Sequence, residues 1–305
     1  MILLTLGSGT ILLVAWVGSA WLAKKILTPI EVLSSGAETT SEADLMKRLT
    51  LDSPYQEFLR LTQAFNSVMD RFQRSVESQR RFVDHAAHEM QTPLTVLQGN
   101  LEVALLKART SEEYREALAT LRDESQHLTR IIEDLFTLTR ADAGQYPLNL
   151  RDIYLDELAI DALHRARSLA LAKHITLTSA IAPELLLHAD EVLLGRMILN
   201  LLDNAIKYTP EGGTVSLECV KQGDEYRLTV SDTGPGISPE LQDRIFERFF
   251  RADKARSRAD GGTGGAGLGL SIARWIAEAH HGRLELTRSG PGGTAFTAWL
   301  PIRTA

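Results

Sequence analysis

The segment HAAHEMQTPL, residues 85–94, carries a histidine placed to react with an incoming group. The segment lies on a predicted helix, and His88 points away from the apolar face of that helix. Thr92 lies one turn further along on the same side, and Pro93 removes a backbone hydrogen bond and should bend the helix nearby. An exposed imidazole can accept a phosphoryl group. Most surface histidines have no such role, and we give that interpretation to His85, His127 and His164.

Two asparagines and a lysine share one face of another predicted helix. In NLLDNAIKY, residues 200–208, Asn200 and Asn204 are four residues apart and Lys207 lies beside them. An amide oxygen is a hard ligand suited to Mg²⁺, and a lysine one turn further on can bind phosphate. Taken alone the pattern is weak, because most asparagines on helices are simply exposed.

Two glycine-containing segments offer further contacts for a nucleotide. DTGPGI follows a strand-like run, so Asp232 lies at a strand end with Gly234 and Gly236 free to adopt positive φ. A carboxylate there can accept a hydrogen bond from the exocyclic amine of adenine, although a plain tight turn is the alternative. In GGTGGAGLGLSIAR, three glycines bring backbone amides to the start of a helix, where phosphate binds: Gly265, Gly267 and Gly269.

The second glycine segment matches neither of the common phosphate-binding loops. It lacks the Lys-Ser/Thr of a P-loop, and it has no following parallel strand with an acidic residue, as a dinucleotide-binding fold requires. The residues before it combine apolar anchors with cations, which suits a lid that closes on a triphosphate, although a solvated basic loop is the alternative. They are Phe246, Phe249, Phe250, Arg251, Lys254, Arg256 and Arg258.

Two long helical patterns must position the candidate histidine. Apolar residues recur at helical spacing over 83–105 and again over 118–135, and RTSEEY between them offers Thr110 or Ser111 as a helix cap. Gly144 ends the second helix. The pattern predicts an antiparallel helical hairpin. Because two helices bury little apolar surface, we expect two copies of the hairpin to form a four-helix bundle.

After the hairpin the chain has an α/β pattern. Short strand-like runs alternate with predicted helices near 155–172, 191–207 and 268–281. Turns at 211–213 and 222–225 are typical of connections between antiparallel strands. The pattern predicts one mixed sheet faced by about three helices. The strand-like runs are HITLTSAI, TVSLECV, EYRLTVSD, RLELTRS and TAFTAWLP.

The N-terminal segment indicates a membrane span. Residues 2–23 carry no charge and are followed by Lys24 and Lys25. A helix of that length rises about 33 Å, enough to cross a hydrocarbon core of about 30 Å. A signal peptide is disfavoured, because its basic residues precede the apolar run. The lysines place the rest of the chain in the cytoplasm, and we expect a further span and an extracytoplasmic domain upstream.

Between the span and the hairpin, residues 26–78 have the pattern of two helices with a polar connector. Pro29 suits a first helical turn, GAETTSEAD interrupts the pattern, and a second helix opens near Tyr55. In that helix apolar residues step by 3, 4, 3 and 4 as in a coiled coil, although an ordinary amphipathic helix fits as well. They are Phe58, Leu61, Phe65, Val68 and Phe72.

Composition excludes several classes of protein. Of the 305 residues, 44% are apolar and 24% are charged, as in globular domains. The net charge of −6 argues against nucleic acid as a partner. The single cysteine, Cys219, excludes an intrachain disulfide and a cysteine-based zinc module.

Taken together, HExxTP, NxxxNxxKY, DxGxG, FxxFF, GxGxGL and a late GGT at 292–294 resemble the motifs of the histidine-kinase family, and the resemblance covers residues 26–302. It implies a multidomain chain, consisting of a transmembrane helix (1–25), a HAMP-like linker (26–78), a dimerisation and phosphoacceptor helical hairpin (79–147) and an α/β-sandwich catalytic domain of the Bergerat ATP-binding fold (148–305).

By that resemblance, the second half of the chain binds ATP and Mg²⁺. Asn204 would ligate magnesium, Asp232 would contact adenine, and Lys207 and Tyr208 would flank the nucleotide. ATPases that share the fold have a glutamate where Asn200 stands, and an amide cannot act as a base at neutral pH, so hydrolysis is disfavoured. The other implied nucleotide contacts are Asn200, Gly234, Gly236, Phe250, Arg251, Gly265, Gly267, Leu268 and Gly269.

The acceptor implied by the family is His88, whose neutral imidazole attacks the γ-phosphate in line. Glu89 would accept or orient the ring proton, and Thr92 would position water when the enzyme dephosphorylates its partner. The resemblance further implies a homodimer held by the hairpin and linker at the cytoplasmic membrane. The phosphoryl group would pass to an aspartate of a response regulator.

Two departures from the family pattern flank the acceptor. Gln91 stands where arginine is frequent and Met90 where leucine is usual, which bears on the rate rather than on the chemistry. Two alternatives stay open at this point. One is a regulator that mainly removes phosphate from its partner, and the other is a plain ATPase of the same fold.

Overall fold

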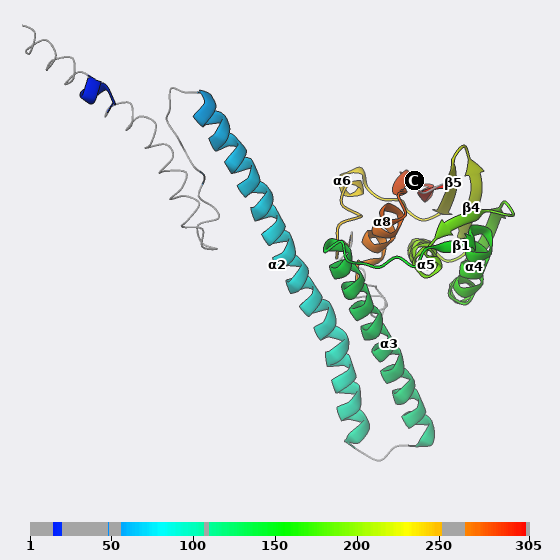
Figure 1. Cartoon of the computed structure of the whole chain (residues 1–305). Helices are drawn as coiled ribbons and strands as arrows, with labels where there is room; N and C mark the ends of the chain where they lie inside the picture. Colours follow the sequence, from blue (N-terminus) through cyan, green and yellow to red (C-terminus); the bar gives the residue numbers. More distant parts are fainter. Residues whose placement is uncertain (1–14, 20–47, 49–55, 107–109, 252–265, 303–305) are drawn as a thin grey trace, which may run out of the picture. The chain divides into compact units, whose positions relative to one another are not determined.

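The computed structural model describes residues 15–19, 48, 56–106, 110–251 and 266–302 (Figure 1). The predicted membrane span and most of the predicted linker lie outside these residues, apart from a short helical segment at 15–19. Among the residues described, no helix has both the length and the apolar character needed to cross a bilayer. The chain divides into two compact units, residues 1–84 and 85–305.

The helix α2, Gln56–Leu105, contains both the second predicted linker helix and the helix predicted to carry the histidine. It begins one residue after the predicted start at Tyr55, and Pro93 lies inside it. In the first unit, Arg48 donates to the Asp70 carboxylate at 2.8 Å and to the Gln73 side-chain oxygen at 2.6 Å. Residue 48 therefore lies alongside α2.

The helix α3, Ser111–Asp142, completes the predicted hairpin. Thr110 is its N-cap and forms a capping box with Glu113, in which each side chain accepts a hydrogen bond from the other residue's backbone amide. Gly144 follows the last turn with a φ of +62°. These caps confirm both predicted ends of the second hairpin helix.

A five-stranded mixed sheet forms the centre of the C-terminal half of the chain. The strand order is β2-β4-β5-β7-β6, with β2 parallel to β4 and all other neighbours antiparallel. The five predicted strand-like runs all belong to this sheet. Its strands are β2 Thr176–Ile181, β4 Thr214–Gln222, β5 Glu225–Asp232, β6 Arg283–Gly290 and β7 Gly293–Pro301.

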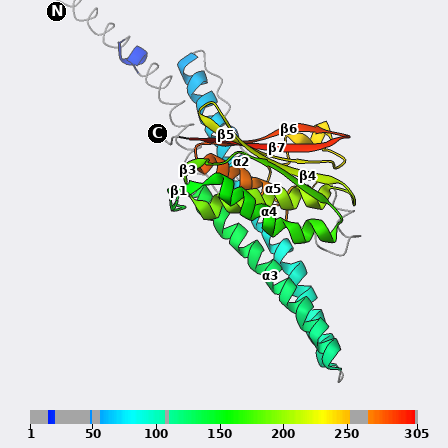
Figure 2. The same cartoon turned by 90° about the vertical axis from the view of Figure 1, so that its right-hand side faces the viewer.

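Three helices pack against the sheet, as predicted: α4 Leu155–Ala172, α5 Glu191–Tyr208 and α8 Gly269–Ala279. Figure 2 shows α4 and α5 side by side below the sheet. The apolar face of α5 is fully buried through Leu194, Met197, Ile198 and Leu201. Burial of that face fixes the direction in which its polar face, with Asn200 and Asn204, must point.

The structure corrects one predicted turn and adds a second sheet. The turn at 211–213 joins α5 to β4, which is parallel to its neighbour β2, so it does not connect antiparallel strands. The turn at 222–225 does join the antiparallel pair β4 and β5. A second, two-stranded sheet of β1 Arg151–Tyr154 and β3 Leu186–Ala189 was not predicted. A short helix, α6 Pro239–Gln242, follows the DxGxG segment.

A buried histidine supports the start of α5. The His280 Nε2 accepts a hydrogen bond from the backbone amide of Asp190, the N-cap of α5, at 3.0 Å, and Nδ1 lies 2.8 Å from the Ile276 carbonyl oxygen. The ring is therefore neutral, with its proton on Nδ1. Burial lowers the pKa of His280 below its usual value of 6.5.

This arrangement makes stability depend on pH. As the pH falls below 6.5, the unfolded chain takes up a proton at His280, whereas in the folded chain the ring stays neutral to a lower pH. The contribution of the neutral ring to the free energy of unfolding is therefore complete above pH 6.5 and is progressively lost below it. Urea unfolding should show a free energy of unfolding that falls below pH 6.5, by at most about 1.4 kcal/mol per pH unit from this residue, because only the unfolded chain gains the proton. The loss should be smaller in His280→Leu and unchanged in His164→Gln. Equal pH profiles in all three proteins would contradict the assignment.

Candidate active site

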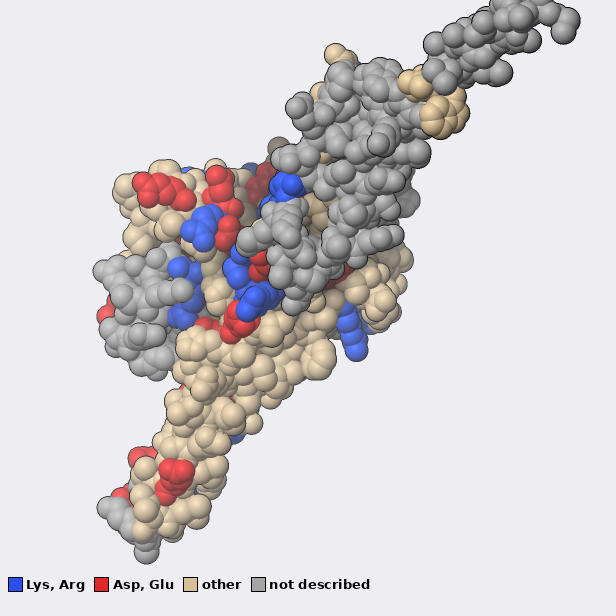
Figure 3. All heavy atoms as spheres, turned by 90° about the vertical axis from the view of Figure 1, so that its left-hand side faces the viewer, with Lys and Arg blue, Asp and Glu red and all other residues tan. Residues whose placement is uncertain are grey.

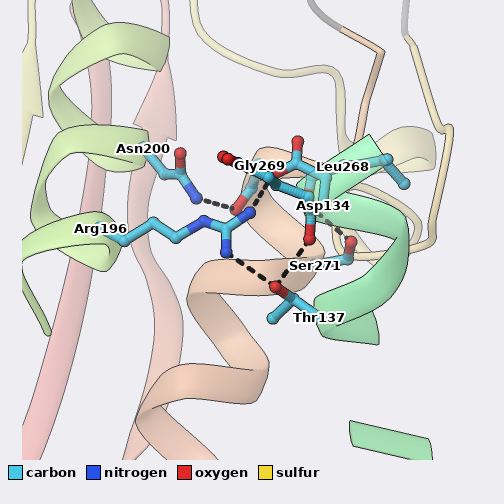
Figure 4. Close-up of polar contacts among 8 residues, drawn as sticks. Asp134, Thr137, Arg196, Asn200, Leu268, Gly269 and Ser271 are labelled. Atoms are coloured by element: carbon cyan, nitrogen blue, oxygen red, sulfur yellow. Dashed lines mark hydrogen bonds and ion pairs between the residues drawn. The ribbon is translucent and has the colours of Figure 1, made fainter. Parts of the chain in front are cut away.

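The asparagine helix and the glycine segment meet at a hydrogen bond. The Asn200 side-chain amide donates to the Gly269 carbonyl oxygen at 3.2 Å (Figure 4). Gly269 is the first residue of α8, and a Cβ there would lie within 4 Å of the Asn200 side chain. Two motifs separated by 69 residues therefore form one wall. Asn204, one turn beyond Asn200, is half-buried, and its side chain makes no hydrogen bond to any residue the structure describes.

Asp232 is the last residue of β5, as predicted, and the structure shows that it is buried. One of its carboxylate oxygens, Oδ1, accepts hydrogen bonds from the backbone amides of Gly234 at 2.7 Å and Thr294 at 3.1 Å. Burial raises the pKa of Asp232, while these two hydrogen bonds and the Arg288 charge act in the opposite direction. The late GGT segment thus meets the DxGxG turn. Oδ1 is occupied within the protein, and these bonds leave Oδ2 as an acceptor.

The two glycines of the DxGxG turn serve different purposes. Gly236 has a φ of +78°, as predicted, but Gly234 does not adopt positive φ. Gly234 is needed for space, since a Cβ there would lie 2.9 Å from the Tyr208 carbonyl oxygen. The end of α5 therefore packs directly on the turn that holds Asp232.

The aromatic segment contacts the glycine loop at its base. The Phe249 amide donates to the Gly267 carbonyl oxygen at 3.0 Å. Gly267 has a φ of +73°, and a Cβ there would lie 2.9 Å from the Phe250 carbonyl oxygen, so only glycine fits. Leu268 is buried as the N-cap residue of α8. Gly265, Lys254, Arg256 and Arg258 lie outside the described residues.

Two cations of the predicted site influence each other. The pKa of Lys207 is lowered, first by burial and then by the positive charges of Arg251 and Lys173. The Lys207 ammonium group also lies 5.1 Å from the centre of the Tyr208 ring, which is half-exposed. Phe250 packs under the Arg244 guanidinium. Lys207 and Arg251 therefore raise the positive potential at one end of α5, which favours an anion.

The donor set fits a magnesium ion that is bound together with phosphates. Within the described part of the chain, no three His, Cys, Asp or Glu side chains are grouped to hold a metal. Mg²⁺ commonly keeps several waters and takes only one or two protein oxygens when it binds with nucleotide phosphates. The free amide oxygen of Asn204 suits that arrangement.

The candidate acceptor lies on an exposed part of α2. His88 is exposed and Glu89 is half-buried, and the described residues give the His88 ring no hydrogen-bond partner. The Thr92 hydroxyl donates to the His88 backbone carbonyl oxygen at 3.3 Å. Because the two residues are four apart on α2, their side chains share one face of the helix. One turn earlier, the His85 ring lies 5.4 Å from that of Phe249. Sequence reasoning had treated His85 as a bystander and missed this contact.

Charged side chains also join α3 to α5, and no sequence signal pointed to them. Arg196 forms an ion pair with Asp134 and donates to the Thr137 hydroxyl at 2.8 Å (Figure 4). Burial raises the pKa of Asp134, and the Arg196 charge partly offsets this. A charge on α3 also influences α5, although the two groups involved form no ion pair within the part of the chain that the structure describes. Burial raises the pKa of Asp203 on α5, and Arg130 on α3 lowers it.

Cysteine cross-linking can test the α3–α5 contact. The native Cys219 is buried and its thiol pKa is raised to about 12, so it should not react with maleimides. With Asp134→Cys and Arg196→Cys, a short bismaleimide should form an intrachain link, detected by mass spectrometry. In the control pair, Glu124→Cys and Arg196→Cys, the cysteine on α3 is displaced by about 15 Å along the helix from position 134. This pair should not form the link. Equal linking of both pairs would contradict a specific contact.

Two family models match the chain. Residues 78–144 match the His Kinase A (phospho-acceptor) domain, and residues 189–304 match the histidine kinase-, DNA gyrase B-, and HSP90-like ATPase family. The first contains the α2–α3 hairpin region around His88. The second contains α5, the DxGxG turn and the glycine loop.

Two curated relatives align with most of this chain. A sensor-like histidine kinase, SenX3 of Mycolicibacterium smegmatis, is 32% identical over 90% of this chain and 70% of its own length. The sensor protein IrlS of Burkholderia pseudomallei is 34% identical over 92% of this chain, which spans 59% of that protein. This chain therefore covers only about three fifths of some relatives.

Two solved structures share the architecture. Full-length ShkA in complex with AMPPNP is 28% identical, with a TM-score of 0.56 over 73% of this chain and 46% of that one. The histidine kinase ThkA in complex with the response regulator protein TrrA is 20% identical, with a TM-score of 0.56 over 76% of this chain and 66% of that one. The second likeness bears on the fold alone.

Proposed function

This chain belongs to the sensor histidine kinase family, and from that premise we propose that it phosphorylates its own His88 from Mg-ATP and passes the phosphoryl group to an aspartate of a response regulator. The observation that carries the proposal is that three hydrogen bonds connect five separate motifs in pairs. Asn200 bonds to Gly269, Asp232 bonds to Thr294, and Phe249 bonds to Gly267.

Each part of that site has a task in nucleotide binding. The second carboxylate oxygen of Asp232 accepts a hydrogen bond from the exocyclic amine of adenine, which distinguishes adenine from guanine. Lys207 and Arg251 bind phosphate oxygens. Mg²⁺, when bound, neutralises charge that develops on the phosphates, and Asn204 would be its protein ligand. Asn200 cannot activate water as a base, and its amide is engaged with Gly269.

The transfer step needs an exposed nucleophile. The unprotonated ring nitrogen of His88 forms a bond to the γ-phosphorus while the bond to the β,γ-bridging oxygen breaks and ADP leaves. Glu89 receives or orients the proton on the other ring nitrogen. In the reverse role, Thr92 positions water when the enzyme removes phosphate from the regulator. The i, i+4 spacing of His88 and Thr92, which puts both side chains on one face of α2, supports that assignment.

The proposal also covers dimerisation through the hairpin and membrane anchoring by the N-terminal segment. We propose that two copies pair through the hairpin as a four-helix bundle, and that the apolar residues 2–23 anchor the chain in the cytoplasmic membrane, next to a HAMP-like linker. On the face of the molecule that Figure 3 draws, much of the surface of the hairpin lacks charged side chains. Large apolar side chains are exposed on α2 and α3, namely Leu94, Val96, Leu101, Val103, Leu118 and Phe136.

Incubation with γ-labelled ATP and Mg²⁺ tests the reaction. We expect label bound to the protein that is labile to acid and stable to base, as a phosphoramidate is, with ADP formed in equal amount. A purified response regulator should then take the label from the protein. Release of free phosphate without labelled protein would identify an ATPase and overturn the proposal.

A further inference from the structure

A lysine outside every motif binds the end of the helix that carries the nucleotide site. The Lys173 ammonium group donates to the carbonyl oxygens of Ile206 at 3.1 Å, Lys207 at 2.6 Å and Thr209 at 3.0 Å. An ammonium group has three donors, so these bonds use all of them. The last carbonyls of a helix have no partner within the helix and carry partial negative charge. Lys173 therefore supplies side-chain donors to two carbonyls in the last turn of α5, those of Ile206 and Lys207, and to the carbonyl of the C-cap residue Thr209.

The backbone before β2 holds Lys173 in place. Lys173 is the C-cap of α4, and His174 follows it with a φ of +53°. The amide of His174 donates to the Leu171 carbonyl oxygen, and the amide of Ile175 donates to that of Ala170 at 2.8 Å. These two bonds form the usual left-handed end of a helix. Ile175 is buried, so the chain cannot turn away without exposing it.

The turn bound by Lys173 carries the candidate nucleotide residues. Asn204, Lys207 and Tyr208 all lie within the last turn and a half of α5. The Tyr208 carbonyl oxygen in turn packs against Gly234 of the Asp232 turn. A change in the position of this last turn would therefore move both the phosphate side and the adenine side of the pocket.

We propose that Lys173 is a positioning residue for nucleotide binding, which fixes the last turn of α5 so that Asn204, Lys207 and the Asp232 turn face one ligand. The proposal rests on the proposed function, because it takes the end of α5 as the ATP site. Lys173 acts through the backbone carbonyls of α5 and not by touching the nucleotide. It is exposed, so its removal leaves no buried charge or cavity.

A positioning role and a merely structural role predict different kinetics. If Lys173 only adds stability, its loss reduces the fraction of folded enzyme and leaves the KM for Mg-ATP unchanged. If Lys173 positions the last turn, its loss weakens binding by every folded molecule, and KM rises. Faster hydrogen exchange confined to the last turn of α5 would accompany the second outcome.

The test compares Lys173→Met, which keeps the length of the side chain but removes its donors, with Lys173→Arg and with Lys221→Met. Lys221 is exposed on β4, outside the site, and serves as the control. In the full chain we expect the KM for Mg-ATP to rise about tenfold in Lys173→Met, the effect of losing one hydrogen bond to a charged group. Lys173→Arg should give an intermediate KM, and Lys221→Met should match the unmodified protein.

The outcomes separate this proposal from the proposed function. An unchanged KM and unchanged exchange of residues 205–209 in Lys173→Met, with normal binding by the unmodified protein, would overturn the role of Lys173 alone. Failure of the unmodified protein to bind Mg-ATP, measured by calorimetry, would overturn the proposed function and the role of Lys173 with it. If Lys173→Met does not fold, Lys173→Arg provides the test. The proposal requires a raised KM for Mg-ATP in the folded fraction of that variant, and an unchanged KM would overturn it.

Discussion

Replacing His88 by glutamine should abolish phosphate labelling of the protein completely. Glutamine is a good helix former of similar size, so α2 keeps its structure, but its amide is no nucleophile at neutral pH. The imidazole is exposed and has no hydrogen-bond partner among the described residues, so its loss disturbs no other contact. Acid-labile label, counted after incubation with γ-labelled ATP, should fall to the background of the assay.

The control for this variant is His85→Gln, one turn earlier on the same helix. His85 contacts the Phe249 ring, so its replacement should slow labelling without abolishing it. Both variants should bind Mg-ATP as the unmodified chain does, because neither residue is part of the nucleotide pocket. Label that persists in His88→Gln would place the acceptor at another residue.

Local signals made the hairpin and the main sheet predictable. Thr110 forms a capping box and Gly144 adopts positive φ, and each depends on neighbours within four residues. The burial pattern of β5 alternates strictly, which is the period that the sequence shows. The order of the motifs predicted that Asn200, Asp232 and Gly267 belong to one site. The structure adds hydrogen bonds between motifs, from Asn200 to Gly269 and from Thr294 to Asp232.

Contacts between distant segments were not predictable, because they leave no local pattern. β1 and β3 are only four residues long, and α4 and β2 separate them in the sequence. Neither segment has a pattern long enough to predict a strand by itself. The turn at 211–213 has the composition of a hairpin turn but joins α5 to β4. The partner of β4 on that side is β2, which is parallel to it and lies before α5 in the chain, and composition does not show this pairing. The bonds of Lys173 to α5 depend on packing of two helices and on no motif.

Replacing Asp232 by asparagine should raise the dissociation constant for ATP by about 100-fold and remove the preference for ATP over GTP. The side-chain oxygen of asparagine can still accept the hydrogen bonds from Gly234 and Thr294. The atom that faces the adenine amine then becomes an NH₂ group, which cannot accept. Losing a charge-assisted hydrogen bond and opposing two donors together cost about 3 kcal/mol. Calorimetry with ATP and GTP measures both effects.

The same variant should not lower the stability of the protein. Burial raises the pKa of Asp232, so the folded chain binds a proton at this carboxyl more tightly than the unfolded chain does. Ionisation at neutral pH therefore costs folding free energy, and asparagine avoids that cost. We expect a melting temperature equal to or above that of the unmodified protein, while Asp224→Asn, in the exposed turn between β4 and β5, should change neither property. A lowered melting temperature together with unchanged ATP affinity would show that Asp232 holds the turn and does not contact the base.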